Sequence, residues 1–140
     1  NHAMPQHVVQ RCVEALNQSG KPVNGSRILL LGLAYKSDVD DCRESPAFAV
    51  MDKLKDMGAD LRYYDSYVPE VPPTREHSDW TGFKSVEWNE ESIREHDLAV
   101  ILTAHNGVNY AQLAEWASIV VDTRNTMAGV HRGTAKIWKA

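Results

Sequence analysis

The sequence predicts a doubly wound α/β domain with a mainly parallel sheet, flanking helices and a leading N-terminal helix. Short apolar runs are typical of strands buried on both faces of a parallel sheet. Segments with apolar residues at helical spacing lie between them, and most connections are short. The 140 residues fit one domain, since about 100–150 residues is the commonest domain size.

The first helix is predicted from apolar residues at helical spacing, followed by a stop signal at Gly20. These apolar residues are Val8, Val9, Cys12, Val13 and Leu16. We expect this helix to pack at one edge of the domain or to join a preceding domain. Because the chain starts inside a helical pattern and without methionine, we expect it to be part of a longer protein.

The strands and helices that follow alternate along the chain, which makes the predicted fold Rossmann-like. The predicted strands are residues 27–33, 60–65, 83–88, 98–103 and 118–122. The predicted helices are residues 46–58, 89–96 and 110–116. Ser45 is the expected N-cap of the first of these helices, with Pro46 at its first position and Gly58 at its C-cap. Residues 66–82 form the longest irregular stretch, and residues 129–140 remain unassigned.

Composition excludes several classes of function. A net charge of −4 argues against non-specific nucleic-acid binding, which needs a basic face. No apolar run approaches the roughly 20 residues that cross a bilayer, and no secretory signal opens the chain. Cys12 and Cys42 form no CxxC pair, so neither zinc nor a disulfide framework is indicated. We therefore expect no metal and no membrane partner, and a cytoplasmic location.

The connection at residues 32–46 is the first candidate site. It is long for a strand-to-helix connection, where two to six residues are typical, and six of its residues are charged. It lacks the GxGxxG pattern of a self-contained dinucleotide site. Lys36, Arg43 and the following helix N-terminus favour a bound anion, and Arg43 could donate to two phosphate oxygens. Alternatively, the four acidic residues of the loop pair with the two cations and cap the helix.

Three further residues follow predicted strands at the same rim of the sheet. Arg124 could bind a ligand, although an arginine there is more often a surface residue. His105 could be a ligand, a base or a capping residue. Asp65 is similar in position to the carboxylate that binds a ribose. The other histidines show no metal spacing and are predicted to lie on the surface: His2, His7, His77, His96 and His131.

Four segments together resemble the C-terminal part of the UDP-glucose/GDP-mannose dehydrogenase family, in the right order and over nearly the whole chain. They are GLAYKSDVDDCRESP at 32–46, YDSYVP at 64–69, DTR at 122–124 and NHAMP at 1–5. The resemblance implies that residues 1–20 end a central connecting helix and that residues 21–140 form the UDP-sugar-binding domain. The asparagine–methionine–proline start and His105 are closer to the dehydrogenases of UDP-N-acetylmannosamine and UDP-N-acetylglucosamine than to those of UDP-glucose or GDP-mannose.

The family's reaction oxidises a sugar 6-hydroxyl to a carboxylate in two NAD-dependent steps, through a cysteine thiohemiacetal. The cysteine motif and the glycine-rich NAD domain do not occur in this sequence, so the resemblance implies no catalytic residue here and no activity alone. It implies that Tyr35, Lys36 and Arg124 contact the UDP-sugar. It implies that Arg43 reaches the NAD held by an N-terminal domain.

The implied partners are the N-terminal and central regions of the same enzyme, which is expected to form a homo-oligomer. Two other functions remain open from the residues. The chain could be a non-catalytic nucleotide-binding or regulatory module. It could also be a structural domain that oligomerises through its first helix.

Overall fold

A five-stranded sheet forms the centre of the computed structural model, which describes residues 3–130 and 133–140. Its strands are β1 (Arg27–Leu31), β2 (Asp60–Tyr64), β3 (Leu98–Ile101), β4 (Ile119–Asp122) and β5 (Lys136–Lys139). They lie in the order β2-β1-β3-β4-β5, and each neighbouring pair is parallel. The predicted doubly wound α/β fold is confirmed.

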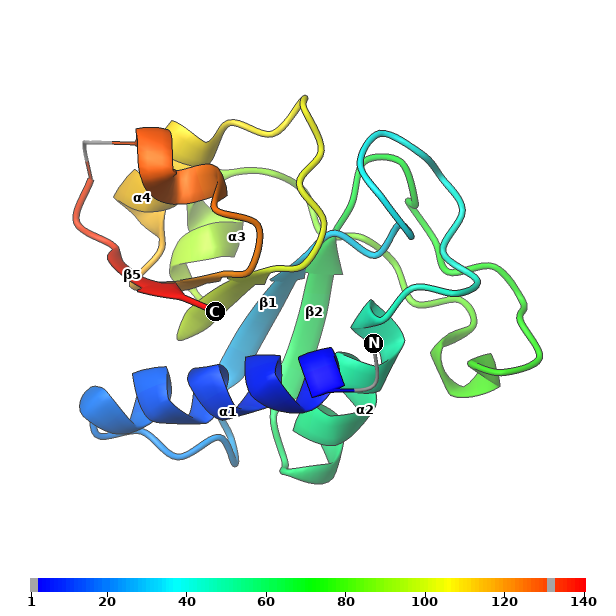
Figure 1. Cartoon of the computed structure of the whole chain (residues 1–140), viewed down its shortest axis with the longest axis horizontal. Helices are drawn as coiled ribbons and strands as arrows, with labels where there is room; N and C mark the ends of the chain where they lie inside the picture. Colours follow the sequence, from blue (N-terminus) through cyan, green and yellow to red (C-terminus); the bar gives the residue numbers. More distant parts are fainter. Residues whose placement is uncertain (1–2, 131–132) are drawn as a thin grey trace.

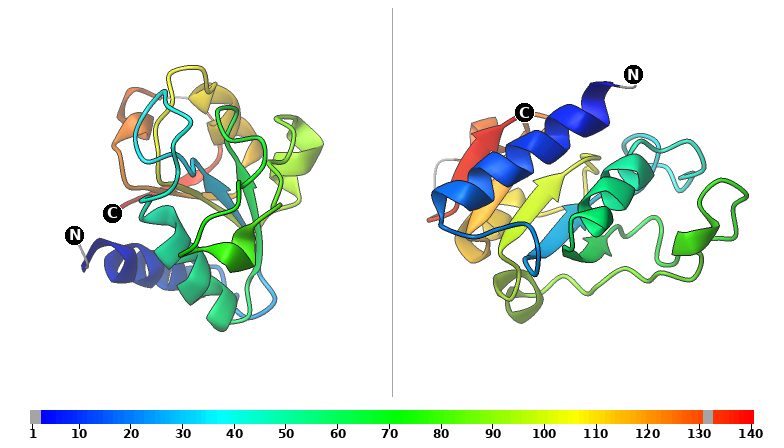
Figure 2. Two further views of the ribbon diagram at one scale, coloured as in Figure 1. Left: turned by 90° about the vertical axis from the view of Figure 1, so that its right-hand side faces the viewer. Right: turned by 90° about the horizontal axis from the view of Figure 1, so that it is seen from below.

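Helices cover both faces of the sheet (Figures 1 and 2). They are α1 (Ala3–Gln18), α2 (Ala47–Asp56), α3 (Glu90–Arg94) and α4 (Tyr110–Trp116), with short 3-10 turns η1 (Ser78–Trp80) and η2 (Thr126–Gly129). Side chains of α1 and α2 share one apolar core with the sheet, whereas those of α3 and α4 share the other. Helix α1 lies beside α2 and crosses β3 and β4, so it packs on a face of the sheet instead of at an edge.

Local signals in the sequence explain where the helices begin and end. Helix α2 starts one residue later than predicted, with Pro46 instead of Ser45 at the N-cap, but the Ser45 Oγ still accepts a hydrogen bond from the Ala47 N–H, 3.2 Å away. Gly58 ends this helix at φ +91°, and its N–H donates to the Lys55 carbonyl. Asn89 and Asn109 cap α3 and α4 through their side-chain oxygens. The serine and asparagine side chains satisfy N–H groups that have no partner within the helix, whereas the Gly58 N–H satisfies a carbonyl at the helix end.

Two parts of the sequence prediction differ from the structure. Residues 83–88 do not form a strand, and Glu70 and Lys84 make only an isolated antiparallel bridge. Instead, backbone groups of Phe83 and Ser85 form hydrogen bonds with the backbone of residues 69–80, earlier in the chain. Strand β5, in the unassigned stretch, pairs with β4 at the edge of the sheet. Its four residues are exposed or half-buried, so they carry no buried-strand pattern.

Residues 66–82, called the excursion below, lie outside the sheet and fold back onto α2 (Figure 1, green). The His77 ring stacks on the Phe48 ring, with centroids 4.3 Å apart. The Trp80 Nε1 donates to Asp52, 2.8 Å away. The buried Tyr63 hydroxyl donates to the Val68 carbonyl, also at 2.8 Å. These contacts fix an irregular segment against α2 and the end of β2.

The strand order places a topological switch point between β1 and β3. The chain winds outward from β1 to β2, then crosses to the other side of β1 to form β3. The loops after β1 and β3 therefore diverge at the carboxyl end of the sheet, where open α/β folds bind their ligands. The two loops are residues 32–46, called the site loop below, and residues 102–109.

Candidate functional site

The site loop begins with a close approach between two strands. Gly32 has φ +93°, and a Cβ at this position would lie 2.7 Å from the backbone N and O of Thr103. The Thr103 hydroxyl donates to the Ala34 carbonyl, 2.8 Å away. Only glycine fits this combination of left-handed backbone and close contact. The first residues of the loop are thus held directly against the end of β3.

Asp65, at the end of β2, is fully buried beneath the site loop. Its carboxylate accepts hydrogen bonds from the backbone N–H of Leu33 at 2.8 Å, of Ala34 at 2.9 Å and of Tyr67 at 2.8 Å. A carboxylate enclosed in this way cannot reach a ligand. The hypothesis that Asp65 binds a ribose is therefore wrong, and its contacts instead stabilise the loop.

His105 is 2% exposed, and both of its ring nitrogens have partners. Its Nδ1 accepts a hydrogen bond from the Asp38 N–H at 2.8 Å, so Nδ1 carries no proton. Its Nε2 lies 3.0 Å from the Asp65 carboxylate, to which it donates. The ring is thus neutral and protonated on Nε2. Of the three roles considered for His105, the structure supports capping, because neither nitrogen is left for a ligand.

Tyr35, Lys36 and Arg124 line one cavity of about 500 Å³ at the switch point. It is called the rim cavity below, and its other lining residues are Ser37, Glu44, Pro46, Thr103 and Ala104. The Nε of Arg124 donates to the Leu102 carbonyl at 2.9 Å, and its backbone N–H donates to Asp122 at 3.0 Å. These bonds fix the guanidinium at the rim. Neither Nη group has a protein partner in the part of the chain that the structure describes.

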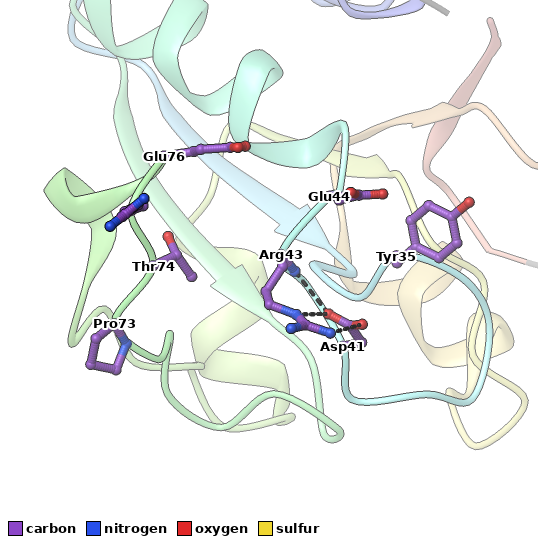
Figure 3. Close-up of a pocket in the computed structure, with 8 residues that line it drawn as sticks. Tyr35, Asp41, Arg43, Glu44, Pro73, Thr74 and Glu76 are labelled. Carbon is purple, nitrogen blue, oxygen red and sulfur yellow. Dashed lines mark hydrogen bonds and ion pairs between the residues drawn. The ribbon is translucent and has the colours of Figure 1, made fainter.

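Arg43 lines an adjoining cavity of about 640 Å³ between the site loop and the excursion (Figure 3). Its side chain is 77% exposed, and it donates to Asp41 through Nε at 3.2 Å and Nη2 at 3.1 Å. This hydrogen bonding lowers the pKa of Asp41 and raises that of Arg43. The remaining lining residues are Tyr35, Glu44, Pro73, Thr74, Arg75 and Glu76. Tyr35 and Glu44 are shared with the rim cavity, so the two cavities have a common wall.

The alternative hypothesis, that the acidic residues of the site loop pair with its two cations and cap the helix, is only partly correct. Asp41 pairs with Arg43, but Lys36 makes no ion pair with any residue within the described ranges. The Asp38 carboxylate accepts from the Asn106 backbone N–H at 2.9 Å and from its side-chain amide. None of the four acidic side chains caps α2 within those ranges. Lys36 is thus available to a ligand.

The excursion residues of the Arg43 cavity, among them Thr74 and Arg75, were missed from the sequence. The excursion has no periodic pattern, and its position depends on packing against α2. His96 was predicted to lie on the surface and this is wrong, since it is 4% exposed and its buried Nε2 has no hydrogen-bond partner among residues 3–130 and 133–140. His7 is exposed and His77 half-buried, while His2 and His131 lie outside the described residues.

Both thiols have the properties of inert, buried cysteines. Burial raises the pKa of Cys12 to about 12. Burial also raises the pKa of Cys42, and the charges of Asp41 and Asp65 add to this effect. A nucleophilic thiol needs the opposite shift. Across residues 3–130 and 133–140, no group of three or more metal-ligating side chains could hold an ion, and no helix is long and apolar enough to cross a membrane.

Comparison with known proteins identifies the domain. Residues 29–129 match the UDP-binding domain of the UDP-glucose/GDP-mannose dehydrogenase family. The chain belongs to this family. This UDP-binding domain is 32% identical over 110 residues to a UDP-glucose 6-dehydrogenase of Bacillus subtilis, covering 76% of the chain and 23% of that relative. It is 33% identical over 104 residues to a UDP-N-acetyl-D-mannosamine dehydrogenase of Pyrococcus horikoshii, covering 66% and 24%.

Solved structures give the same picture of this UDP-binding domain. It resembles the structure of UDP-D-ManNAc dehydrogenase from Pyrococcus horikoshii with a TM-score of 0.75 and 25% identity, over 98% of the chain and 31% of that structure. The GDP-mannose dehydrogenase from Pseudomonas aeruginosa, 21% identical with a TM-score of 0.58, shares the fold. The domain thus spans about a quarter to a third of the relatives it matches. The family resemblance predicted from the sequence is confirmed.

Proposed function

We propose that this domain is the nucleotide-sugar-binding part of an NAD-dependent UDP-sugar 6-dehydrogenase and is inactive alone. The observation that carries the proposal is the convergence of Tyr35, Lys36 and Arg124 on one cavity at the switch point. Two cations there complement a diphosphate, which is the charged part of a UDP-sugar. The exposed Tyr35 ring offers an apolar face to the uridine or the sugar.

The adjoining cavity supports a site for the cofactor. Arg43 uses Nε and Nη2 to bind Asp41, and its Nη1 remains for a phosphate of NAD held by an N-terminal domain. When bound, NAD supplies the hydride acceptor. Because the two cavities share Tyr35 and Glu44, substrate and cofactor would meet at this common wall. Closure of the domains over it would orient the two ligands and exclude water.

The rest of the enzyme would complete the site. Helix α1 would continue from a central region that supplies the nucleophilic cysteine, since Cys12 and Cys42 are buried with raised pKa values. We propose a homo-oligomer for the full-length protein. The preferred substrate is a UDP-N-acetylhexosamine, which agrees with the names of several relatives. A UDP-glucose or GDP-mannose substrate is the alternative within the family.

The binding proposal is tested by calorimetric titration of the chain with UDP. Lys36→Ala and Arg124→Ala should each weaken binding about tenfold or more, because hydrogen bonds to charged groups contribute about 1.5–3 kcal/mol. The matched controls are Lys84→Ala and Arg94→Ala, which remove exposed cations that line neither cavity. If wild type binds UDP but the Lys36 and Arg124 variants bind it as tightly as the controls do, UDP binds at a different site. Absence of wild-type binding would overturn the proposal.

The dehydrogenase proposal needs a second experiment. The chain alone should reduce no NAD with any UDP-sugar, and turnover above background would refute its dependence on other regions. A panel of UDP-sugars on the full-length enzyme identifies the substrate. A parent gene without an upstream cysteine-bearing region would instead favour a non-catalytic nucleotide-binding module.

A further inference from the structure

The site loop is pinned at its centre by residues that follow β3. The Tyr35 N–H donates to the Asp41 carbonyl at 2.6 Å, which closes the turn that presents Tyr35 and Lys36. Asp38 lies inside this turn at φ +62°. Its backbone N–H donates to the His105 Nδ1, and its carboxylate accepts from Asn106. The conformation of the turn thus depends on contacts outside the loop.

We propose that His105 is a positioning residue that sets this turn for nucleotide binding, through its neutral, Nε2-protonated form. The inference rests on the proposed function, because it assigns a role in binding the same ligand. The Asp65 carboxylate accepts a hydrogen bond from the Nε2–H, so the proton stays on Nε2 and the Nδ1 lone pair accepts the Asp38 N–H. The same Asp65 oxygen holds the N–H groups of Leu33 and Ala34. His105 thereby joins the start of the loop to its middle.

Histidine suits this position because a rigid ring offers an acceptor and a donor in opposite directions. The Tyr67 ring stacks on one face of this buried ring, with centroids 4.5 Å apart. The Tyr67 hydroxyl also lies 3.4 Å from the Asp38 carboxylate. The ring is therefore fixed in orientation as well as in protonation. A purely space-filling residue would need neither of its two hydrogen bonds.

Two variants separate the two bonds. In His105→Asn, the side-chain oxygen can occupy the Nδ1 position and still accept the Asp38 N–H, but contact with Asp65 is lost. In His105→Gln, the longer amide can reach Asp65, but the acceptor for Asp38 is lost. We expect both to lower stability, while only His105→Gln weakens UDP binding, by about tenfold, as the loss of one satisfied hydrogen bond predicts.

The experiment combines three measurements on the chain. Two-bond ¹H–¹⁵N correlation of the wild-type imidazole should show Nε2 protonated and Nδ1 unprotonated. Amide hydrogen exchange should show Asp38 protected in wild type and His105→Asn but exchanging faster in His105→Gln. In calorimetric titration, UDP affinity should likewise be retained in wild type and His105→Asn and reduced in His105→Gln. The matched control is His96→Asn, which changes another buried histidine, at the opposite end of β3, and should alter neither Asp38 exchange nor UDP affinity.

Several results would overturn the proposal. An Nδ1-protonated ring would contradict the assigned form even if the variants failed to fold. Equal losses of UDP affinity in both His105 variants, in proportion to lost stability, would reduce His105 to a structural residue. If wild type binds no UDP, the proposed function is wrong, and UDP is not the ligand that this turn binds. The imidazole spectrum and the Asp38 exchange then still decide whether His105 sets the loop.

Discussion

Replacing Gly32 with alanine should lower the free energy of unfolding by about 3 kcal/mol. The structure gives two contributions. At φ +93°, a residue with a Cβ costs about 1–2 kcal/mol. The new Cβ would also lie 2.7 Å from the backbone N and O of Thr103, and overpacking of this kind costs about 1–3 kcal/mol. Because the clash is with backbone, a side-chain rotation cannot relieve it.

Gly25→Ala is the matched control for this prediction. Gly25 has a similar φ of +83°, but a Cβ there would meet no atom of the described residues within 4 Å. It should therefore show the backbone cost alone, about 1–2 kcal/mol. Urea unfolding of the two variants, followed by tryptophan fluorescence at equal m-values, measures both losses. Their difference isolates the close approach of Gly32 to Thr103.

The functional consequence of Gly32→Ala is measured separately. The substitution pushes the start of the site loop away from β3, so the UDP affinity of the folded variant should fall, whereas that of Gly25→Ala should not. Equal destabilisation by the two substitutions would refute the close approach. Unchanged UDP affinity in Gly32→Ala would show that the start of the loop does not position the rim cavity.

Three further predictions each concern a single side chain and its control. Arg43→Gln in the full-length enzyme should raise the KM for NAD about tenfold or more and spare that for the UDP-sugar, unlike the surface control Arg94→Gln; equal effects of the two would refute a cofactor contact. Burial lowers the pKa of His96 below its usual 6.5, so the unfolded state takes up more protons as the pH falls through this value. The unfolding free energy of wild type should therefore fall more between about pH 7 and pH 5.5 than that of His96→Gln, and parallel urea-derived curves would contradict this. Asp38→Asn should weaken UDP binding in calorimetry, whereas Asp40→Asn should leave it unchanged or strengthen it.

Local chemistry made most of the fold predictable. Buried parallel strands are apolar over most or all of their length, as β1 is after Arg27 and β3 is throughout, so they stand out from their surroundings. Helix α2 carries its start and stop signals in Ser45 and Gly58. The sequence also predicted that the candidate residues would lie at one rim of the sheet, because parallel strands bring their carboxyl ends to one edge. The residues assigned to the nucleotide sugar from the family motif do meet in one cavity.

What could not be predicted depends on contacts distant in sequence. Strand β5 is held by pairing with β4 and has no apolar pattern of its own. The burial of His96 depends on packing around the start of β3, which a single polar residue does not reveal. The place of Arg75 in the Arg43 cavity requires the excursion to fold onto α2. An Arg75 variant would therefore be a poor surface control for Arg43→Gln.

The effect of the site-loop charges on ligand binding depends on where each charge is directed and cannot be judged from the net charge of the loop. Four acidic residues and two basic ones give the loop a net negative charge, which by itself would repel a diphosphate. However, Asp38 directs its carboxylate to Asn106, and Asp41 directs its own to Arg43. Removing the charge of Asp38 also removes an acceptor that holds the turn, so binding should weaken although repulsion falls. Asp40 is exposed and makes no such bond within the described residues, so its removal changes repulsion alone. Opposite responses of these two neighbours would show that the acidic side chains build the site instead of opposing its ligand.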